Sequence, residues 1–158
     1  NITVISEDSN GNLTKTNDTI KNNLKNWLNQ YRMVNDTVDI LDAKIVNIGI
    51  NFTVVTQPEE NKFTVLRKAE NALRKQFISI ADISESISIS DIYRVLNLVS
   101  GVSDTIDVSL VRKVGGAYSS VAFNVEEHTS FDGRYLIAPE DVVFEIRFLD
   151  TDVQGVVR

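Results

Sequence analysis

The sequence predicts an α+β fold, a two-layer sandwich in which about three helices pack mainly on one face of a mixed β-sheet. In three segments apolar residues recur every three or four positions, and in others they alternate with polar residues. The order of these segments fits helices that lie on one side of a sheet. With 158 residues, 42% of them hydrophobic, the chain is long enough for one core. We expect residues 17–158 to form a single domain, and residues 1–16 to be a strand or the tail of a preceding region.

The amino-terminal part begins with a short β-prone run. Residues 2–6 form this run, and the turn-forming sequence of residues 8–12 ends it. A helix follows, which Thr16 or Asn17 can cap. Its apolar residues fall on one face: Ile20, Leu24, Trp27, Leu28 and Tyr31. Because Trp27 lies on that face, we expect it to belong to the core.

The middle of the chain predicts a strand, a helix and a second, shorter strand. Residues 44–54 alternate between apolar and polar, which is typical of a half-buried strand. Asn61 can cap a helix that continues to Phe77. The opposite face of this helix carries arginine and lysine, which indicates a solvated face or a surface for an acidic protein partner. The serine- and isoleucine-rich residues 78–90 contain the shorter strand.

The last third predicts one more helix and three more strands. Ser90 can cap a helix that ends near Val99, and Gly101 stands where a left-handed residue closes a helix. Period-two alternation then predicts strands over residues 102–110, 121–125 and 142–148.

These patterns together predict a core of large apolar side chains. We expect the following residues to be buried: Ile48, Ile50, Phe52, Leu66, Leu73, Leu96, Ile106, Val108, Phe144 and Ile146. Replacing one of the larger ones by alanine should cost about 2–5 kcal/mol of stability.

Composition and charge exclude several function classes. The chain has no cysteine, which excludes disulfides, thiolate metal sites and cysteine nucleophiles. Its net charge of −6 opposes binding to a phosphate backbone, so we expect no nucleic-acid partner. No apolar run of about 18 residues is present to span a bilayer, and we expect no membrane partner. The chain begins at Asn1 and has its only methionine at Met33, which indicates a processed or excised part of a longer polypeptide.

Three aspartates precede the long strand at a spacing of three: Asp36, Asp39 and Asp42. On a helix they would project from nearly one face, and hard cations prefer several such oxygens. The pattern of a calcium loop is absent, however, and no histidine is near to complete a mixed site. We therefore interpret them as groups that cap and orient the entry into the strand, and we expect no metal and no cofactor.

The residues that suggest catalysis lack a matching sequence context. His128 lies near Ser130 and Asp132 in a polar loop, but no nucleophile motif such as G-x-S-x-G surrounds them. The sequence KVGGAYSS, residues 113–120, lacks the P-loop pattern and indicates a tight turn at its paired glycines. We expect no enzyme activity and no catalytic residues. A hydrolase that uses these three side chains is a third hypothesis beside the two functions given below.

Four stretches of the chain resemble one known family, in the same order. They are LNQYRMVNDTVDILDAKIVNIGINFTVV, NKFTVLRKAENALRKQF, ISISDIYRVLNLVSGVSDTIDVSLVRKVGGAYSS and YLIAPEDVVFEIRFLDTDVQGVVR. Together they span nearly all of Leu28 to Arg158. They are similar to the carboxyl-terminal part of the large baseplate wedge subunit of T-even-like contractile-tailed bacteriophages, within the wider baseplate J-like family. Residues 1–26 match less distinctly.

The resemblance implies a structural virion protein. In that family two copies of the subunit join a second, larger wedge protein, and six wedges close an inner ring around the tail hub. This ring rearranges when the sheath contracts. The resemblance therefore implies contacts with other copies of the chain and with other wedge proteins, assembly in the host cytoplasm, and a final place in the tail baseplate. It brings no catalytic residue and no cofactor.

The contact residues are predicted from residue type alone. Tyr118, Phe131 and Tyr135 lie in the glycine turn and in the loop 126–139, and aromatic side chains are enriched at interface centres. The alternative function is a small-ligand or carbohydrate-binding domain of a tail protein. In that case the same three residues and Trp27 would stack on the ligand.

Overall fold

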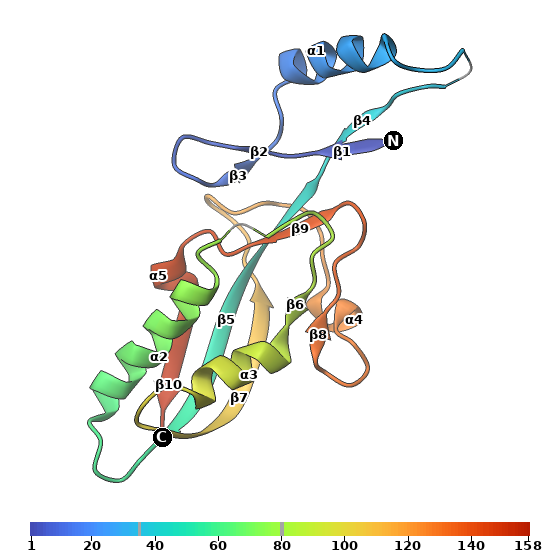
Figure 1. Ribbon diagram of the computed structural model, residues 1–158. Helices are drawn as coiled ribbons and strands as arrows, with labels where there is room; N and C mark the ends of the chain where they lie inside the picture. The colour runs from blue at the N-terminus through green and yellow to red at the C-terminus, as the bar shows by residue number, and fades with distance from the viewer. Residues whose placement is uncertain (35, 80) are drawn as a thin grey trace.

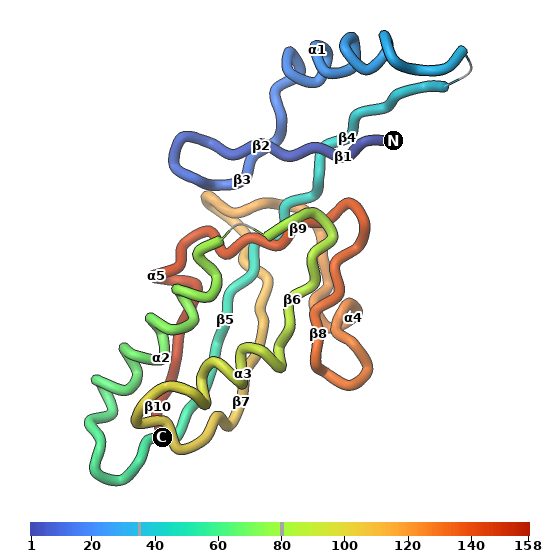
Figure 2. The backbone as a smooth tube through the Cα atoms, viewed as in Figure 1, coloured from blue at the N-terminus to red at the C-terminus, as the bar shows by residue number. Residues whose placement is uncertain are grey.

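The computed structural model describes residues 1–34, 36–79 and 81–158, and it has two parts (Figure 1). A body contains the central sheet and the helices packed on it. The arm, which we define as residues 1–42, stands above the body in the view of Figure 1. Figure 2 shows the chain passing from the arm into the strand that becomes the centre of the sheet. The mixture of helices and mixed sheets confirms the predicted α+β class.

Strand β5 (Lys44–Thr56) is the centre of the body, as its long alternation predicts. Along one edge, β7 (Val102–Arg112) pairs with it in antiparallel orientation. Along the other edge, β9 (Val142–Glu145) pairs in parallel with the first residues of β5, and β10 (Val153–Val157) pairs with the later ones. Two short strands thus fill one position of the mixed sheet in tandem.

The predicted strand over residues 142–148 ends earlier than expected, and β10 is an addition that the sequence patterns did not predict. β9 ends at Glu145, and the short helix α5 (Leu149–Asp152) precedes β10. Over this interval β5 advances only from Asn47 to Ile50. The chain that pairs with it has more residues to place, so the excess leaves the sheet as α5.

Helices α2 (Lys62–Gln76) and α3 (Ile89–Asn97) cover one face of the sheet, α2 over β10 and α3 over β7 (Figure 1). Asn61 caps α2 as predicted, because its side chain accepts hydrogen bonds from two N–H groups of the first turn. The cap of α3 is Ser88 and not the predicted Ser90, since the helix begins earlier than its periodicity suggests. Gly101 takes a positive φ of 94°, in the turn that follows α3.

The core lies between these two helices and the inner face of the sheet. Its buried members include seven of the ten predicted residues: Ile48, Ile50, Phe52, Leu73, Leu96, Val108 and Phe144. Leu66 and Ile146 are partly buried against the same core.

Ile106 contradicts the core prediction, with 48% of its surface exposed. The pairing of β5 and β7 contains a β-bulge at this point, because Thr53 pairs with Asp107 while the next residue, Val54, pairs with Thr105. The extra residue reverses the in-and-out alternation of β7. Thr105 is therefore buried, and Ile106 faces outward.

The arm is a set of short elements around one helix. In chain order they are β1 (Ile2–Val4), β2 (Ser6–Glu7), β3 (Leu13–Thr14), α1 (Asp18–Asn29) and β4 (Ile40–Asp42). β1 and β4 pair in parallel, and β2 and β3 form an antiparallel hairpin. Asp8 closes the hairpin turn by accepting hydrogen bonds from the N–H groups of Asn10 and Asn12. Asn17 caps α1, as one of the two predicted candidates.

Three short elements complete the body: β6 (Ile87–Ser88), α4 (Val125–His128) and β8 (Tyr135–Leu136). β6 and β8 pair in antiparallel orientation. The predicted strand over residues 121–125 is wrong: residues 121–124 are irregular, Val125 begins α4, and Val121 and Phe123 pack against the core without sheet pairing. Across the described residues, the structure contains no helix with the length and apolar character needed to cross a membrane.

Candidate protein-contact surfaces

Tyr118 is held to the body by a hydrogen bond and an aromatic contact. Its hydroxyl donates a 2.6 Å hydrogen bond to Asp152 Oδ1, and its ring meets the Phe148 ring edge-on with centroids 5.6 Å apart. Asp152 is 1% exposed, accepts a second hydrogen bond from the Phe148 N–H, and lies 3.9 Å from Lys113 Nζ. The hydrogen bond to this carboxylate, followed by burial, raises the pKa of Tyr118 above its ordinary value. Tyr118 thus ties the glycine turn to α5, and only part of its ring is left for a partner.

Phe131 and Tyr135 lie together on a hairpin that ends in β8. The Ser130 N–H donates to the Tyr135 carbonyl at 2.8 Å, and the Ser130 hydroxyl donates to Asp132 at 2.6 Å, which fixes the hairpin tip. Phe131 is fully exposed at this tip, and Tyr135 is about half exposed. In Figure 1, β8 lies on the other side of β5 from α5. The structure therefore brings two of the three predicted contact residues together and leaves Tyr118 apart.

A further group of exposed apolar side chains lies on the arm. Helix α1 buries none of its residues. Ile20 is 56% exposed, Trp27 55% and Tyr31 71%, and the Trp27 and Tyr31 rings contact each other at 5.0 Å. The prediction that Trp27 belongs to the core is wrong, because helical periodicity identifies an apolar face but not what covers it. We call Ile20, Leu24, Trp27 and Tyr31 the arm stripe.

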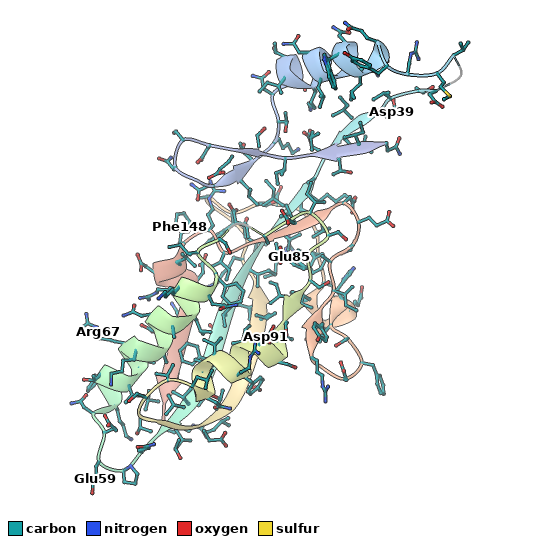
Figure 3. The ribbon with its side chains drawn as sticks, in the orientation of Figure 1. Asp39, Glu59, Arg67, Glu85, Asp91 and Phe148 are labelled. Atoms are coloured by element: carbon teal, nitrogen blue, oxygen red, sulfur yellow. The ribbon has the colours of Figure 1, made fainter. Side chains whose placement is uncertain are left out.

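Two lysines on α1 form ion pairs with aspartates in and just before β4. Lys21 Nζ lies 2.9 Å from Asp42 Oδ2 and 2.9 Å from Asp18 Oδ1, and Lys25 Nζ lies 3.9 Å from Asp39 Oδ1. The hydrogen bonds to Asp42 and then to Asp18 raise the pKa of Lys21. Figure 3 shows Asp39 below α1, at the end of the arm. Partly exposed ion pairs of this kind contribute little stability each, so α1 is weakly attached.

The three aspartates before β5 take part in this attachment. Asp39 and Asp42 orient the chain as ion-pair partners of α1 and do not act as the caps that we expected. Asp36 is exposed, and its backbone carbonyl accepts a 2.8 Å hydrogen bond from Arg32. In the three described segments, no group of three or more histidine, aspartate or glutamate side chains is placed to hold a metal ion.

A buried polar network joins the arm to the body. Glu145 of β9 accepts a 2.6 Å hydrogen bond from the Leu13 N–H and a 2.7 Å hydrogen bond from Asn47 Nδ2. Asn47 is buried in turn, and its oxygen accepts from the Ser119 N–H at 2.7 Å. Beside this network Leu13 packs against Val143 in a small second apolar cluster. The hairpin of the arm is therefore tied to the sheet, whereas α1 is distant from this junction (Figure 1).

His128 is not linked to the two residues that a hydrolase would need. Its Nδ1 lies 2.8 Å from the Asn124 carbonyl oxygen, and its ring stacks on Phe123 with centroids 4.3 Å apart. Ser130 instead donates to Asp132 within the hairpin tip. Among the hydrogen bonds of the described chain, none joins His128 to Ser130 or Asp132.

An open cleft of about 610 Å³ lies where the arm meets the body. Its walls come from the β2–β3 hairpin, the end of α2, the segment before α3, and β9, and they include Glu85 and Arg147. Figure 3 labels Glu85 at this junction. The four residues predicted to stack on a small ligand all lie elsewhere: Trp27, Tyr118, Phe131 and Tyr135.

Comparison with known proteins adds no relative. A scan against protein-family models found no match for the chain, and a search of curated proteins found none either. The resemblance to baseplate wedge subunits therefore rests on the four sequence stretches alone. The arm stripe is the surface that sequence reasoning missed: its periodicity was visible, but that pattern is the same for a covered and an uncovered helix.

Proposed function

We propose that the chain is a structural virion protein, a baseplate wedge subunit of a contractile-tailed bacteriophage that contacts other copies of itself and other wedge proteins. After assembly in the host cytoplasm, the subunit would lie in the inner ring around the tail hub, and it would change its place there when the sheath contracts. The ordered resemblance over Leu28 to Arg158 supports this proposal. No part of the proposal requires a catalytic residue or a cofactor.

The observation that carries the proposal is the uncovered apolar face of the arm. An isolated helix of this length is marginally stable in water, and so is an isolated pair of short strands. α1 has 12 residues and buries none of them. A partner that covers Ile20, Trp27 and Tyr31 would remove apolar surface from water, at about 25 cal/mol per Å². Exposed apolar groups gathered in this way are typical of a contact surface.

The division into an arm and a body also suits a subunit that moves within a ring. The arm is attached through the hydrogen bonds of Glu145 and through the passage of the chain into β5. Packed interfaces convert small local shifts into rigid-body movements. An arm that holds a neighbour while the body turns would meet the needs of a ring that rearranges.

The proposal is tested on purified particles of the phage whose genome encodes the chain. Peptides of the chain should be found by mass spectrometry in washed particles and enriched in isolated baseplates, and antibodies against the body should label the tail end. A capsid protein serves as the control, because it should be present in particles and depleted from baseplates. A chain that remains in the soluble lysate and is absent from washed particles would contradict the proposal.

A further inference from the structure

We infer that α2 presents a basic face on which an acidic helix of a different protein docks. We define the basic face as the exposed cations Arg67, Lys68 and Lys75 together with the partly buried Arg74. This inference rests on the proposed function, because it gives the chemistry of one partner of a subunit that assembles with other proteins. It concerns the body and does not involve the arm stripe.

The positive charge of the chain is concentrated on this one helix. The 15 residues of α2 contain five of the 16 lysines and arginines of the chain and only one of its 22 acidic residues. A chain with a net charge of −6 therefore has a positive surface on the outer side of α2, where Figure 3 labels Arg67. A separated charge of this kind attracts an acidic partner and orients it before contact.

Three of the four cations have no partner within the described part of the chain. Among the ion pairs and hydrogen bonds of residues 1–34, 36–79 and 81–158, none uses the side chain of Arg67, Lys68 or Lys75. Lys68 and Lys75 also have no acidic residue three or four positions away, where a solvated helix commonly places ion-pair partners. The helix dipole favours Lys75 in the last turn, but its effect is confined to that turn and does not account for Arg67 and Lys68.

Arg74 is held in place beside these cations. Its Nε donates a 3.0 Å hydrogen bond to the Leu149 carbonyl and lies 3.7 Å from Asp150 Oδ1. Next to it, the short side chains of Thr64 and Asn71 line an open depression of about 360 Å³ on the outer surface of α2. Side chains of a partner can therefore enter between the cations without displacing any part of the body.

The spacing of the cations indicates that the docked segment is a helix. Lys68 and Lys75 are seven positions apart, which is close to two turns or about 10 Å along the axis. Arg67 and Arg74 repeat the same interval. A second helix packed alongside at a shallow angle presents its own side chains at this interval. Two carboxylates seven positions apart on that helix would then reach Lys68 and Lys75 together.

An exposed aromatic ring beside the basic face adds an apolar contact. Phe63 is 80% exposed and lies four positions before Arg67, so the two side chains are neighbours on the helix surface. Exposed ion pairs contribute little each, whereas a covered aromatic ring is typical of interface centres. We therefore expect the docked helix to carry an apolar residue opposite Phe63 beside its carboxylates.

Neither a second copy of the chain nor a nucleic acid matches the basic face. Across the described residues, no helix carries two carboxylates seven positions apart, so a second copy does not provide the docked helix. Carboxylates also border both ends of α2: Glu59 and Glu60 precede it, and Asp150 adjoins its last turn. A nucleic-acid strand longer than about 22 Å would extend past these groups and be repelled, whereas a short helix fits between them.

Two synthetic peptides test the chemistry and the spacing in solution. Both are labelled helices three heptads long and of the same composition. In the first, glutamates form rows seven positions apart beside a leucine, and in the second they are spread around the helix. By fluorescence anisotropy, the chain should bind the first peptide at least tenfold more tightly than the second, and added salt should weaken this binding. Equal affinities, or no binding of either peptide, would overturn the inference.

Charge reversal locates the binding site. Lys68→Glu should weaken binding of the first peptide at least fivefold, and Phe63→Ser should weaken it without disturbing the fold, because both side chains are exposed. Lys15→Glu is the matched control, since it makes the same charge change at an exposed lysine of the arm, and it should alter the affinity less than twofold. Equal losses in the two glutamate variants would show that only the net charge matters and would overturn the site.

Photo-cross-linking tests whether the basic face is occupied in the assembled particle. A photoreactive amino acid takes the place of Asn71 in the phage-encoded chain, and isolated baseplates are irradiated. Mass spectrometry should identify a cross-linked peptide of a different protein that carries two acidic residues seven positions apart. Baseplates that contain the chain but give a cross-link to another copy, to DNA or to nothing would keep the proposed function and overturn the docking. A chain that binds the first peptide but is absent from particles would overturn the function alone.

Discussion

The buried carboxylate of Asp152 accepts a hydrogen bond from the hydroxyl of Tyr118. Tyr118→Phe removes one hydrogen bond from a buried acceptor, so we expect the free energy of unfolding to fall by about 1–3 kcal/mol. Urea denaturation at neutral pH measures this loss. Tyr135→Phe is the control, because no hydrogen bond of the described chain uses the Tyr135 hydroxyl, and its effect should stay below about 0.5 kcal/mol. Equal effects of the two variants would show that the bond to Asp152 contributes nothing.

The same hydrogen bond predicts how stability depends on pH. It raises the folded-state pKa of Tyr118 above the ordinary value of 10.0, so the folded chain keeps a proton that the unfolded chain loses. The stabilising contribution is therefore complete below pH 10 and is lost as the pH rises through the folded-state pKa. The phenolate absorbance of the folded chain should contain a late-titrating component. This component should be missing in Tyr118→Phe, and its persistence there would assign it to another tyrosine.

Two leucines near the end of α3 provide a matched test of the core. Leu96 is 0% exposed and Leu98 is 80% exposed, although they are two positions apart. Leu96→Ala should cost about 2–5 kcal/mol, because it leaves a cavity among packed side chains, and Leu98→Ala should cost less than about 0.5 kcal/mol. The midpoints of urea unfolding measure both changes, provided that the slope is unchanged. Similar losses would mean that α3 is oriented differently from the structure described.

At the scale of elements, β10 can pack beside β5 and α2 in this way because residue 155 is a glycine. A side chain at Gly155 would meet the Phe52 ring and would come within 2.7 Å of Leu66 Cδ1. Gly155→Ala should therefore destabilise the chain by about 1–3 kcal/mol through overpacking. The same substitution should cost less in a Phe52→Leu background, where the ring is absent. A double-mutant cycle measures this coupling, and an additive result would contradict the contact.

Elements with a long local signal are the ones that can be predicted from the sequence. β5 and the three long helices have a regular apolar period along their length, β7 has one from Ile106 to Leu110, and Asn17 and Asn61 cap α1 and α2 as expected. Local patterns cannot reveal features that depend on distant partners. The bulge at Ile106 depends on the register with β5, and β10 exists because β5 offers a free edge beyond β9.

The candidate contact surfaces were likewise predictable only as far as local patterns reach. Periodicity identifies the apolar face of α1 in full, including Trp27, but it cannot state whether another element of the chain covers that face. The aromatic residue types at Tyr118 and Phe131 were equally visible. One of them is tied to a buried carboxylate and the other is free at a hairpin tip, and only the tertiary structure separates these cases.

For the whole molecule, the question is whether the arm and the body unfold as one unit. Glu145 accepts a 2.6 Å hydrogen bond from Leu13 in the arm and a 2.7 Å hydrogen bond from Asn47 in the body. Glu145→Ala would leave both donors buried without an acceptor, at a cost of about 1.5–3 kcal/mol for each bond to a charged group. The loss should fall mainly on the arm, because the body keeps its sheet and its larger core.

Amide hydrogen exchange distinguishes the two possibilities. In Glu145→Ala the amides of α1 and of the β2–β3 hairpin should exchange much faster, while those of β5 and α2 keep their protection. Glu145→Gln serves as the control, since its amide oxygen can still accept from Leu13, and it should loosen the arm less. If the protection of β5 falls in step with that of α1, the arm and the body form one cooperative unit. An arm that turns independently in a ring would then require this junction to open first.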